Sequence, residues 1–230
     1  MSTPGAAKDP PCVYAAVRAV GTIRPKFQVG AQGRVFADSL DVRGTAFWVQ
    51  GTTAMITCAH VVQDLVVSPI ELTGLLVVGS PHGYLRATVT TVDFVHDLAV
   101  LQLGDDVSGE LASQEAASGL EFADRYPTVG ERVAYAGFPG GLQLLDKSQM
   151  PTFAAGVIGA QVRERGPAKF IQITGPVLGG FSGAPVVLES DPKLVIAVVS
   201  NSPSSETGQA GIFLASSWQH ARALVGLTTS

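Results

Sequence analysis

Residues 179–185 read GGFSGAP, and two earlier segments, ITCAH (56–60) and HDLAVL (96–101), supply the side chains that such a stretch needs. A serine hydroxyl is a weak nucleophile at its ordinary pKa. It requires an imidazole to take its proton and a carboxylate to orient that imidazole. Ser182, His60 and Asp97 are of these three types. Their chain order, His then Asp then Ser, predicts hydrolysis of peptide bonds through an acyl-enzyme.

The glycines around Ser182 suit the same chemistry. Gly180 can adopt a positive φ at little cost, which would aim its amide inward. We therefore expect the N–H groups of Gly180 and Ser182 to form an oxyanion hole. Each segment taken alone also fits a plain structural role: a Gly/Ser turn, a core histidine or a turn aspartate. Their joint occurrence in this order favours catalysis.

Composition limits the function classes. The 230 residues are 46% hydrophobic and 15% charged, with 26 glycines, 14 prolines and a net charge of −4. Without a basic run, neither nucleic acid nor an anionic membrane is an expected partner. The N-terminus has no apolar signal core, and the longest apolar runs, such as LVIAVV (194–199), have the length of strands. With Cys12 and Cys58 as the only cysteines, we expect free thiols in the cytoplasm, with one disulfide as the alternative.

Short runs rich in β-branched and aromatic residues, bounded by turn residues, occur six times in each half of the chain and predict strands. The runs are 13–20, 45–50, 53–57, 75–78, 85–94 and 98–103, then 132–137, 153–160, 168–173, 184–189, 193–200 and 211–215. The prediction is an all-β fold of two six-stranded antiparallel β-barrels. We expect a flexible N-terminus (1–12), a first barrel (13–110), a polar, loop-like linker (111–130) and a second barrel (131–230).

One helix is predicted, at residues 216–225, near the C-terminus. Trp218, Ala221, Leu224 and Val225 recur there at near-helical spacing, so one face should dock on the second barrel. Ser216 or Ser217 is a candidate N-cap.

The chain resembles the trypsin/chymotrypsin-fold serine proteases, and within them the bacterial HtrA/Deg-type trypsin-like peptidase domain without a PDZ domain. The resemblance rests on ordered motifs over about residues 40–200. These are GTAFWV (44–49), ITCAH, HDLAVL, YAGFPGGL (135–142), AAGVIG (154–159) and FIQITGPVLGGFSGAPVV (170–187). It implies a chymotrypsin-like double barrel with His60 as general base, Asp97 as its orienting carboxylate and Ser182 as nucleophile. It also implies that VIAVVSN (195–201) pairs with the substrate backbone.

Three positions depart from that family. Phe181 stands where digestive trypsins carry an aspartate that binds a new N-terminal ammonium, and where HtrA-type chains usually carry asparagine. An inserted N-terminus therefore cannot activate this chain by that ion pair. Ala184 replaces the usual second glycine. Cys58 occupies a position where alanine is frequent, and we interpret it as a small buried filler.

The residues before the nucleophile indicate specificity. Pro176 lies six positions before Ser182, and no acidic residue lies between them to pair with a substrate Arg or Lys. We therefore predict an apolar P1 preference. The predicted substrate-binding residues are Val177, Leu178, Gly179, Ser200, Asn201 and Phe213.

No cofactor or metal is predicted, because the chain has no HExxH or CxxC motif and no His or Cys pair at metal-ligand spacing. His96 should face away from the site of Asp97, because neighbouring side chains alternate along a strand. His220 is expected on the surface of the terminal helix.

Three other functions are compatible with part of the sequence. GFSGA approximates the elbow of an α/β-hydrolase, although that fold requires the order Ser, Asp, His. A protease-fold binding module that does not cleave is another. An effector protease that a partner protein recruits or activates is a further possibility. The expected partners are a protein or peptide substrate and such an activator.

Overall fold

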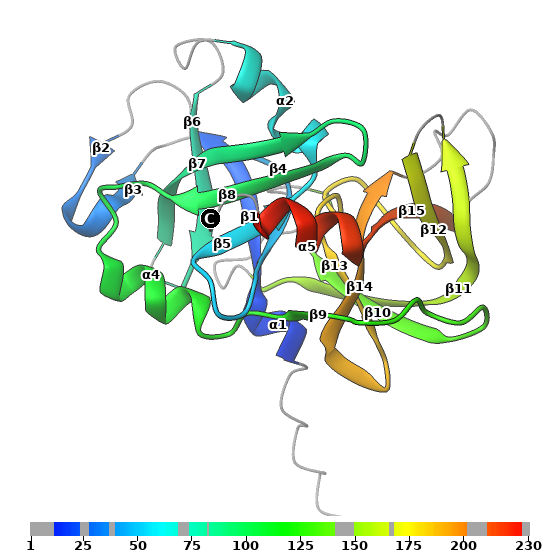
Figure 1. Ribbon diagram of the computed structural model, residues 1–230. Coiled ribbons are helices and arrows are strands. Elements are labelled where there is room, and N and C mark those ends of the chain that lie inside the picture. The colour runs from blue at the N-terminus through cyan, green and yellow to red at the C-terminus, as the bar shows by residue number, and fades with distance from the viewer. Residues whose placement is uncertain are drawn as a thin grey trace, which may run out of the picture.

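The computed structural model describes residues 12–23, 28–36, 40–68, 74–81, 83–140, 150–165, 168–201 and 211–226. Two β-barrels lie side by side and are drawn in blue to green and in green to orange in Figure 1. The predicted double barrel is confirmed. The α/β-hydrolase alternative is wrong, because the described strands form two antiparallel barrels with no layer of alternating helices.

The first barrel closes through six antiparallel strands in the order β7-β6-β1-β4-β5-β8, with β8 pairing back to β7. Short strands β2 and β3 extend this sheet beyond β7. The strands are β1 (Val17–Ile23), β2 (Gln28–Val29), β3 (Arg34–Phe36), β4 (Leu40–Trp48), β5 (Ala54–Thr57), β6 (Leu75–Ser80), β7 (Gly83–Asp93) and β8 (Leu98–Leu103).

The second barrel has the order β13-β10-β11-β12-β15-β14 and closes by the pairing of β13 with β14. Strand β9 (Glu121–Phe122) adds to it in parallel beside β14. The barrel strands are β10 (Arg132–Gly137), β11 (Thr152–Arg165), β12 (Ala168–Thr174), β13 (Pro185–Leu188), β14 (Asp191–Asn201) and β15 (Ile212–Ser217).

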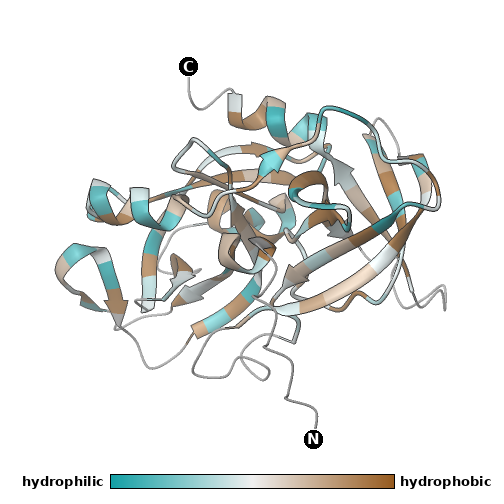
Figure 2. Cartoon of the chain, turned by 90° about the horizontal axis from the view of Figure 1, so that it is seen from below, coloured by the Kyte–Doolittle hydropathy of each residue, from teal (hydrophilic) through white to brown (hydrophobic). Residues whose placement is uncertain are grey.

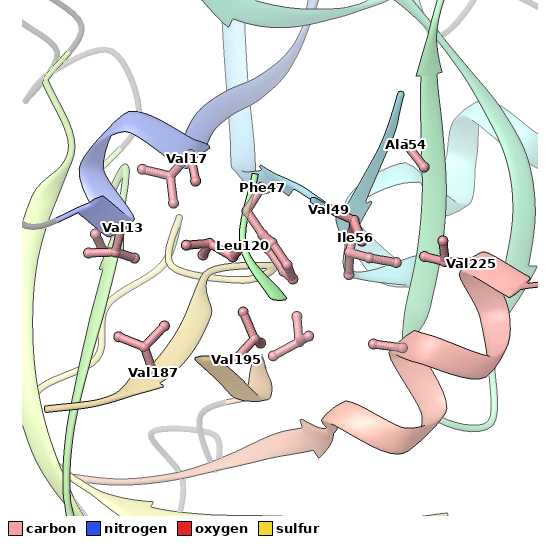
Figure 3. Close-up of a cluster of buried hydrophobic side chains, with 14 of the residues drawn as sticks. Val13, Val17, Phe47, Val49, Ala54, Ile56, Leu120, Val187, Val195 and Val225 are labelled. Carbon is pink, nitrogen blue, oxygen red and sulfur yellow. The ribbon is translucent and has the colours of Figure 1, made fainter. Parts of the chain in front are cut away.

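A hydrophobic cluster fills the seam between the barrels. Phe47 and Ile56 of the first barrel meet Val187 and Val195 of the second, and Val225 of the terminal helix completes the contact (Figure 3). Separate clusters fill the interior of each barrel. Burial of apolar side chains across the seam therefore fixes the two barrels against each other.

Four α-helices are described where one was predicted. They are α1 (Cys12–Ala16), α2 (Ala59–Val67), α4 (Gly109–Ala116) and α5 (Trp218–Gly226), and a short 3₁₀ turn covers Ala31–Gly33. None of the described helices has the length and hydropathy of a membrane-spanning segment. The run 13–20, predicted as a strand, begins as α1 and becomes β1 only at Val17. Short apolar runs fit either structure, and Val13, Ala16 and Val17 are buried at helical spacing.

Helix α4 begins just before the segment predicted as a loop-like linker (111–130) and covers its first residues. The Ser108 side chain caps it by accepting a hydrogen bond from Leu111 N at 3.3 Å. Glu115 of this helix is buried. The polar composition of the segment had not indicated a buried residue.

The terminal helix α5 is present as predicted but begins two residues later, at Trp218, because Ser216 and Ser217 belong to β15. Its four predicted apolar residues are buried. Figure 2 shows hydrophobic and hydrophilic residues alternating along it beside the C-terminal label. Its docking face differs from the prediction: Ala221, Leu224 and Val225 belong to the seam cluster and contact the first barrel as well as the second. Neither serine caps it as predicted. The Ser216 hydroxyl donates to the His96 carbonyl, and the Ser217 hydroxyl is buried without a partner among the described residues.

An ion pair buried at the first barrel ties α4 to β1. Arg18 donates to one carboxylate oxygen of Glu115 at 2.8 and 3.0 Å, and the Ser80 hydroxyl donates to the other at 2.7 Å. The side chains of Arg18 and Glu115 are 12% and 4% exposed. Both charges are thus compensated only by each other and by neighbouring polar atoms.

We predict that Glu115→Leu lowers the free energy of unfolding by about 3 to 5 kcal/mol, because it leaves the Arg18 charge buried and unpaired. Chemical denaturation measures this. The double variant Arg18→Met/Glu115→Leu should recover most of the loss. Glu189→Gln, which breaks the exposed Arg132–Glu189 pair, serves as the control and should cost less than about 1 kcal/mol. Equal losses for Glu115→Leu and Glu189→Gln would contradict the burial argument.

Candidate active site

His60 and Asp97 meet because they follow the register of two paired strands. Strand β5 pairs with β8, with Thr57 opposite Ala99. His60 lies in the first turn of α2, just after β5, and Asp97 directly precedes β8. The His60 Nδ1 lies 2.7 Å from Asp97 Oδ2, and the His60 backbone N–H donates to Oδ1 at 2.9 Å. Both oxygens of the Asp97 carboxylate therefore contact His60.

Asp97 is held in an unusual backbone conformation. Its φ is 55°, one of two positive values among the described non-glycine residues. The Ser200 hydroxyl donates to Oδ2 at 2.6 Å. Burial acts to raise the pKa of Asp97, but the hydrogen bonds from His60 and Ser200 and the charge of His60 outweigh it, so this pKa lies below 3.8. The carboxylate is thus ionised and oriented at neutral pH.

Ser182 lies in a turn that leads into β13 and that only glycine can build. Gly180 and Gly183 have φ values of 101° and 89°. A Cβ at Gly180 would lie 2.2 Å from the Phe138 carbonyl oxygen, and one at Gly183 would lie 2.0 Å from that of Thr45. The backbone N–H groups of Gly180 and Ser182 donate to no acceptor within the described ranges. Two amides of this turn therefore stay available to a ligand.

Thr45 of β4 ties this turn to the first barrel. Its N–H donates to the Ser182 carbonyl at 2.8 Å, and its hydroxyl donates to the Gly180 carbonyl at 2.7 Å. The same hydroxyl accepts from Phe138 N at 3.1 Å. The Thr57 hydroxyl in turn donates to the Thr45 carbonyl at 2.7 Å. Because Thr57 lies three residues before His60, this chain of bonds links the Ser182 turn to the segment of His60.

Cys58 makes a second link between these segments. Its thiol donates to the Val199 carbonyl at 3.0 Å, and Gly183 N–H donates to the same carbonyl at 2.8 Å. Cys58 is a free, fully buried cysteine, so the alternative of a Cys12–Cys58 disulfide is wrong. Burial comes first among the causes that raise the pKa of this thiol well above 9.0, and the nearby Asp97 charge adds to it.

Phe181 occupies an apolar site. It is buried, and its ring packs edge-on against Tyr135 at 5.5 Å between centroids. Burial raises the pKa of Tyr135 to about 12, and its hydroxyl donates to the Pro176 carbonyl at 2.5 Å. The surroundings of Phe181 therefore stabilise the turn by packing instead of by an ion pair.

The predicted substrate-binding residues have different environments. Leu178 is 64% exposed and Gly179 is also exposed, whereas Val177 packs partly against the core of the second barrel. The Ser200 hydroxyl contacts Asp97. Phe213 is fully buried in the core, so its side chain is no pocket wall. Asn201 ends β14, and its side chain lies outside the described part.

A cleft of about 410 Å³ opens beside His60 and Asp97. Phe94 and Val95 line this cleft, although the sequence did not identify them as site residues. They are 57% and 50% exposed. Gln63 and Phe170 also line it. The only sequence signal for Phe94 and Val95 was their position as an apolar pair directly before the HDLAVL motif. Such a pair fits the end of a strand equally well.

His96 does not share the surroundings of Asp97, as predicted, but for a different reason. Residues 94–97 form a turn, so strand alternation does not apply. The His96 Nδ1 lies 2.7 Å from Asp93 Oδ2, and its ring stacks on His220 of α5 at 3.6 Å. His220 is thus half-buried, whereas the sequence predicted a surface residue. Burial and the nearby His96 lower the pKa of His220.

Comparisons with known proteins agree with this architecture. The family model of the trypsin-like peptidase domain matches residues 44–198. The inactive form of a serine-to-alanine mutant of Rv3671c from M. tuberculosis H37Rv is similar in structure, with a TM-score of 0.63 and 19% identity. That match covers 97% of this chain and 95% of the other. The active form of the Rv3671c protease gives a TM-score of 0.62 at 19% identity, covering 98% and 91%. No curated protein sequence matches.

We predict that Thr45→Val destabilises the protein, because it leaves the Gly180 carbonyl and the Phe138 N–H without their partner. The expected loss is about 1 to 3 kcal/mol for each of these two groups, measured by denaturant unfolding. Thr45→Ser keeps the hydroxyl and should lose much less. Thr53→Val, at an exposed turn, should stay within about 0.5 kcal/mol of wild type. A Thr45→Val protein as stable as Thr53→Val would refute the tether.

The His96–His220 stack predicts a pH dependence of stability. The pKa of His220 is lower in the folded protein than its ordinary value of 6.5, so the unfolded chain binds a proton more readily. Stability from this residue is therefore complete above pH 6.5 and is lost as the pH falls from 6.5 through the folded pKa. We expect His220→Gln to flatten the decline of unfolding free energy in this window. Parallel curves for His220→Gln and wild type would show that the stack does not contribute.

Proposed function

The chain belongs to the trypsin-like peptidase family, and from this we propose that it is a serine endopeptidase with Ser182, His60 and Asp97 as its catalytic residues. One observation carries the proposal: both oxygens of Asp97 bind His60, one at the ring Nδ1 and one at the backbone N–H. This arrangement fixes the ring with Nδ1 protonated and leaves Nε2 as the basic nitrogen.

The mechanism follows from these contacts. Ser182 attacks the scissile carbonyl carbon while His60 Nε2 takes the hydroxyl proton. The imidazolium that forms lies against the ionised Asp97, whose low pKa keeps it an acceptor throughout. His60 then protonates the leaving amine, which departs and leaves an ester on Ser182. A water molecule, deprotonated by His60, hydrolyses the ester and regenerates the hydroxyl.

The oxyanion of each tetrahedral intermediate would be bound by the N–H groups of Gly180 and Ser182. Their lack of any other acceptor among the described residues supports this role. The tether to Thr45 and the positive φ of Gly180 support a turn that is already arranged for the oxyanion. These features favour an enzyme whose oxyanion hole is already formed over one whose oxyanion hole a partner protein must form. They also favour an enzyme over a binding module that does not cleave.

The substrate we propose is a protein or peptide with an apolar P1 side chain. Val177, Leu178 and Gly179 are the candidates to contact that side chain, and no acidic residue lies between Pro176 and Ser182. The strand at residues 195–201 would pair with the substrate backbone. A panel of peptides that differ only at P1 tests this preference, and preferred cleavage after Arg or Lys would contradict it.

We predict that Ser182→Ala and His60→Ala each lower peptide turnover by about four to six orders of magnitude, because nucleophile and base act as one unit. Turnover is measured on a peptide library, and labelling with a fluorophosphonate probe reports the activated hydroxyl. Ser113→Ala, at an exposed helix position, is the control and should react as wild type does. Wild-type protein that neither labels nor cleaves would favour the binding module. Turnover that persists unchanged in Ser182→Ala would overturn the mechanism.

A further inference from the structure

We propose that Cys58, His60 and Asp97 form a binding site for a thiophilic divalent cation such as Zn²⁺, and that this cation reversibly switches the enzyme off. The sequence predicted no metal site, because it contains no HExxH or CxxC motif and no His or Cys pair at metal-ligand spacing. The inhibition part rests on the proposed function, whereas the binding part does not.

The geometry carries the proposal. A ligand atom from each of the three side chains, one sulfur, one ring nitrogen and one carboxylate oxygen, lies within 4.8 Å of the other two. In a tetrahedral zinc site with bonds of about 2.0 to 2.3 Å, two ligand atoms stand roughly 3.5 Å apart. Shifts on the order of 1 Å would therefore bring these three atoms into coordination.

The types of ligand atom select the cation. Thiolate, imidazole and carboxylate are the three ligand types of zinc sites in proteins. Mg²⁺ and Ca²⁺ require several oxygen ligands, and Asp97 is the only member of this cluster that supplies oxygen. Zn²⁺, Co²⁺ and Cd²⁺ therefore fit this cluster, and Mg²⁺ does not.

The surroundings hold the ligands and admit a cation. The Ser200 hydroxyl and the His60 backbone N–H fix the Asp97 carboxylate at 2.6 and 2.9 Å, as partners of metal ligands usually do. Cys58 is fully buried, but the His60 side chain is 45% exposed. His60 and Asp97 both line the cleft of about 410 Å³. This cleft gives an entry path and room for a water molecule as the fourth ligand.

Binding would change two existing contacts. The Cys58 thiol now donates to the Val199 carbonyl at 3.0 Å. On coordination it gives up its proton to solvent and forms a sulfur–metal bond. For His60 Nδ1 to coordinate the cation, its proton must move to Nε2, and the contact of 2.7 Å between Nδ1 and Asp97 Oδ2 must open. His60 would then no longer be held as the base for Ser182, so cation binding and peptide turnover should exclude each other.

The binding test uses the full-length Ser182→Ala protein and Co²⁺ as a spectroscopic probe. Coordination by Cys58 predicts a thiolate-to-cobalt charge-transfer band that Zn²⁺ displaces. The band should vanish in Cys58→Ala and Cys58→Ser but persist in Cys12→Ser, which removes the other cysteine of the chain. Thermal unfolding checks that each variant is folded. The absence of the band in a folded Ser182→Ala protein, or its persistence without Cys58, would overturn the proposal.

The inhibition test uses active protein and a peptide substrate. Zn²⁺ should abolish turnover, and a chelator should restore it. In Cys58→Ala, Zn²⁺ inhibition should weaken by at least about tenfold, since loss of even an outer-sphere partner costs 10- to 100-fold in affinity. His220→Gln, which removes an imidazole outside the cluster, should leave inhibition unchanged. Equal inhibition of Cys58→Ala and wild type would refute the switch. A cobalt band in a protein without turnover would instead refute only the proposed function.

Discussion

The hydrogen bonds of Thr45 define how the two barrels fit together. Hydrophobic burial at the seam supplies most of the attraction between them, but that attraction has no direction and would tolerate small shifts of one barrel over the other. Thr45 adds direction, because its amide donates to the Ser182 carbonyl at 2.8 Å and its hydroxyl donates to the Gly180 carbonyl at 2.7 Å. The candidate site draws His60 and Asp97 from one barrel and Ser182 from the other. Its geometry therefore depends on this contact, together with the hydrogen bonds of Cys58 to Val199 and of Ser200 to Asp97, which also join the two barrels.

Three residues of the candidate site have a positive φ, and only one of them is not a glycine. Gly180 and Gly183 have positive φ, as does Asp97 at 55°. Such conformations cost on the order of 1 to 3 kcal/mol for a non-glycine residue and persist only where the surroundings impose them. For Asp97, two contacts from His60 and one from Ser200 impose it. The strain thus lies where an exact carboxylate position is required, and the barrels supply the stability that offsets it.

The sequence allowed the barrels, the family resemblance and the three candidate catalytic residues to be predicted, because strand periodicity and local motifs are written in neighbouring residues. It did not reveal α4, because a polar run gives no sign that Glu115 would be buried against Arg18, 97 positions away. It placed Phe213 at a pocket wall, because an apolar residue in a strand can face either the core or a cleft. It also missed Phe94 and Val95, whose exposure depends on the turn before Asp97. The burial of Glu115 and of Phe213 depends on residues far away in the sequence, whereas the exposure of Phe94 and Val95 depends on a local turn that the strand pattern did not predict.

Cys58 illustrates how one substitution can add a property without a new framework. Orienting a catalytic imidazole requires a fixed carboxylate beside a ring nitrogen, and the second barrel must close around both. These same conditions bring two ligand atoms of a metal site together at the edge of a cleft. A small side chain at position 58 only has to fill the remaining space, as alanine would. A thiol fills that space equally well, but it also places a third, sulfur ligand within 4.8 Å of the other two. Proximity that is needed for proton transfer thus becomes a chelating site.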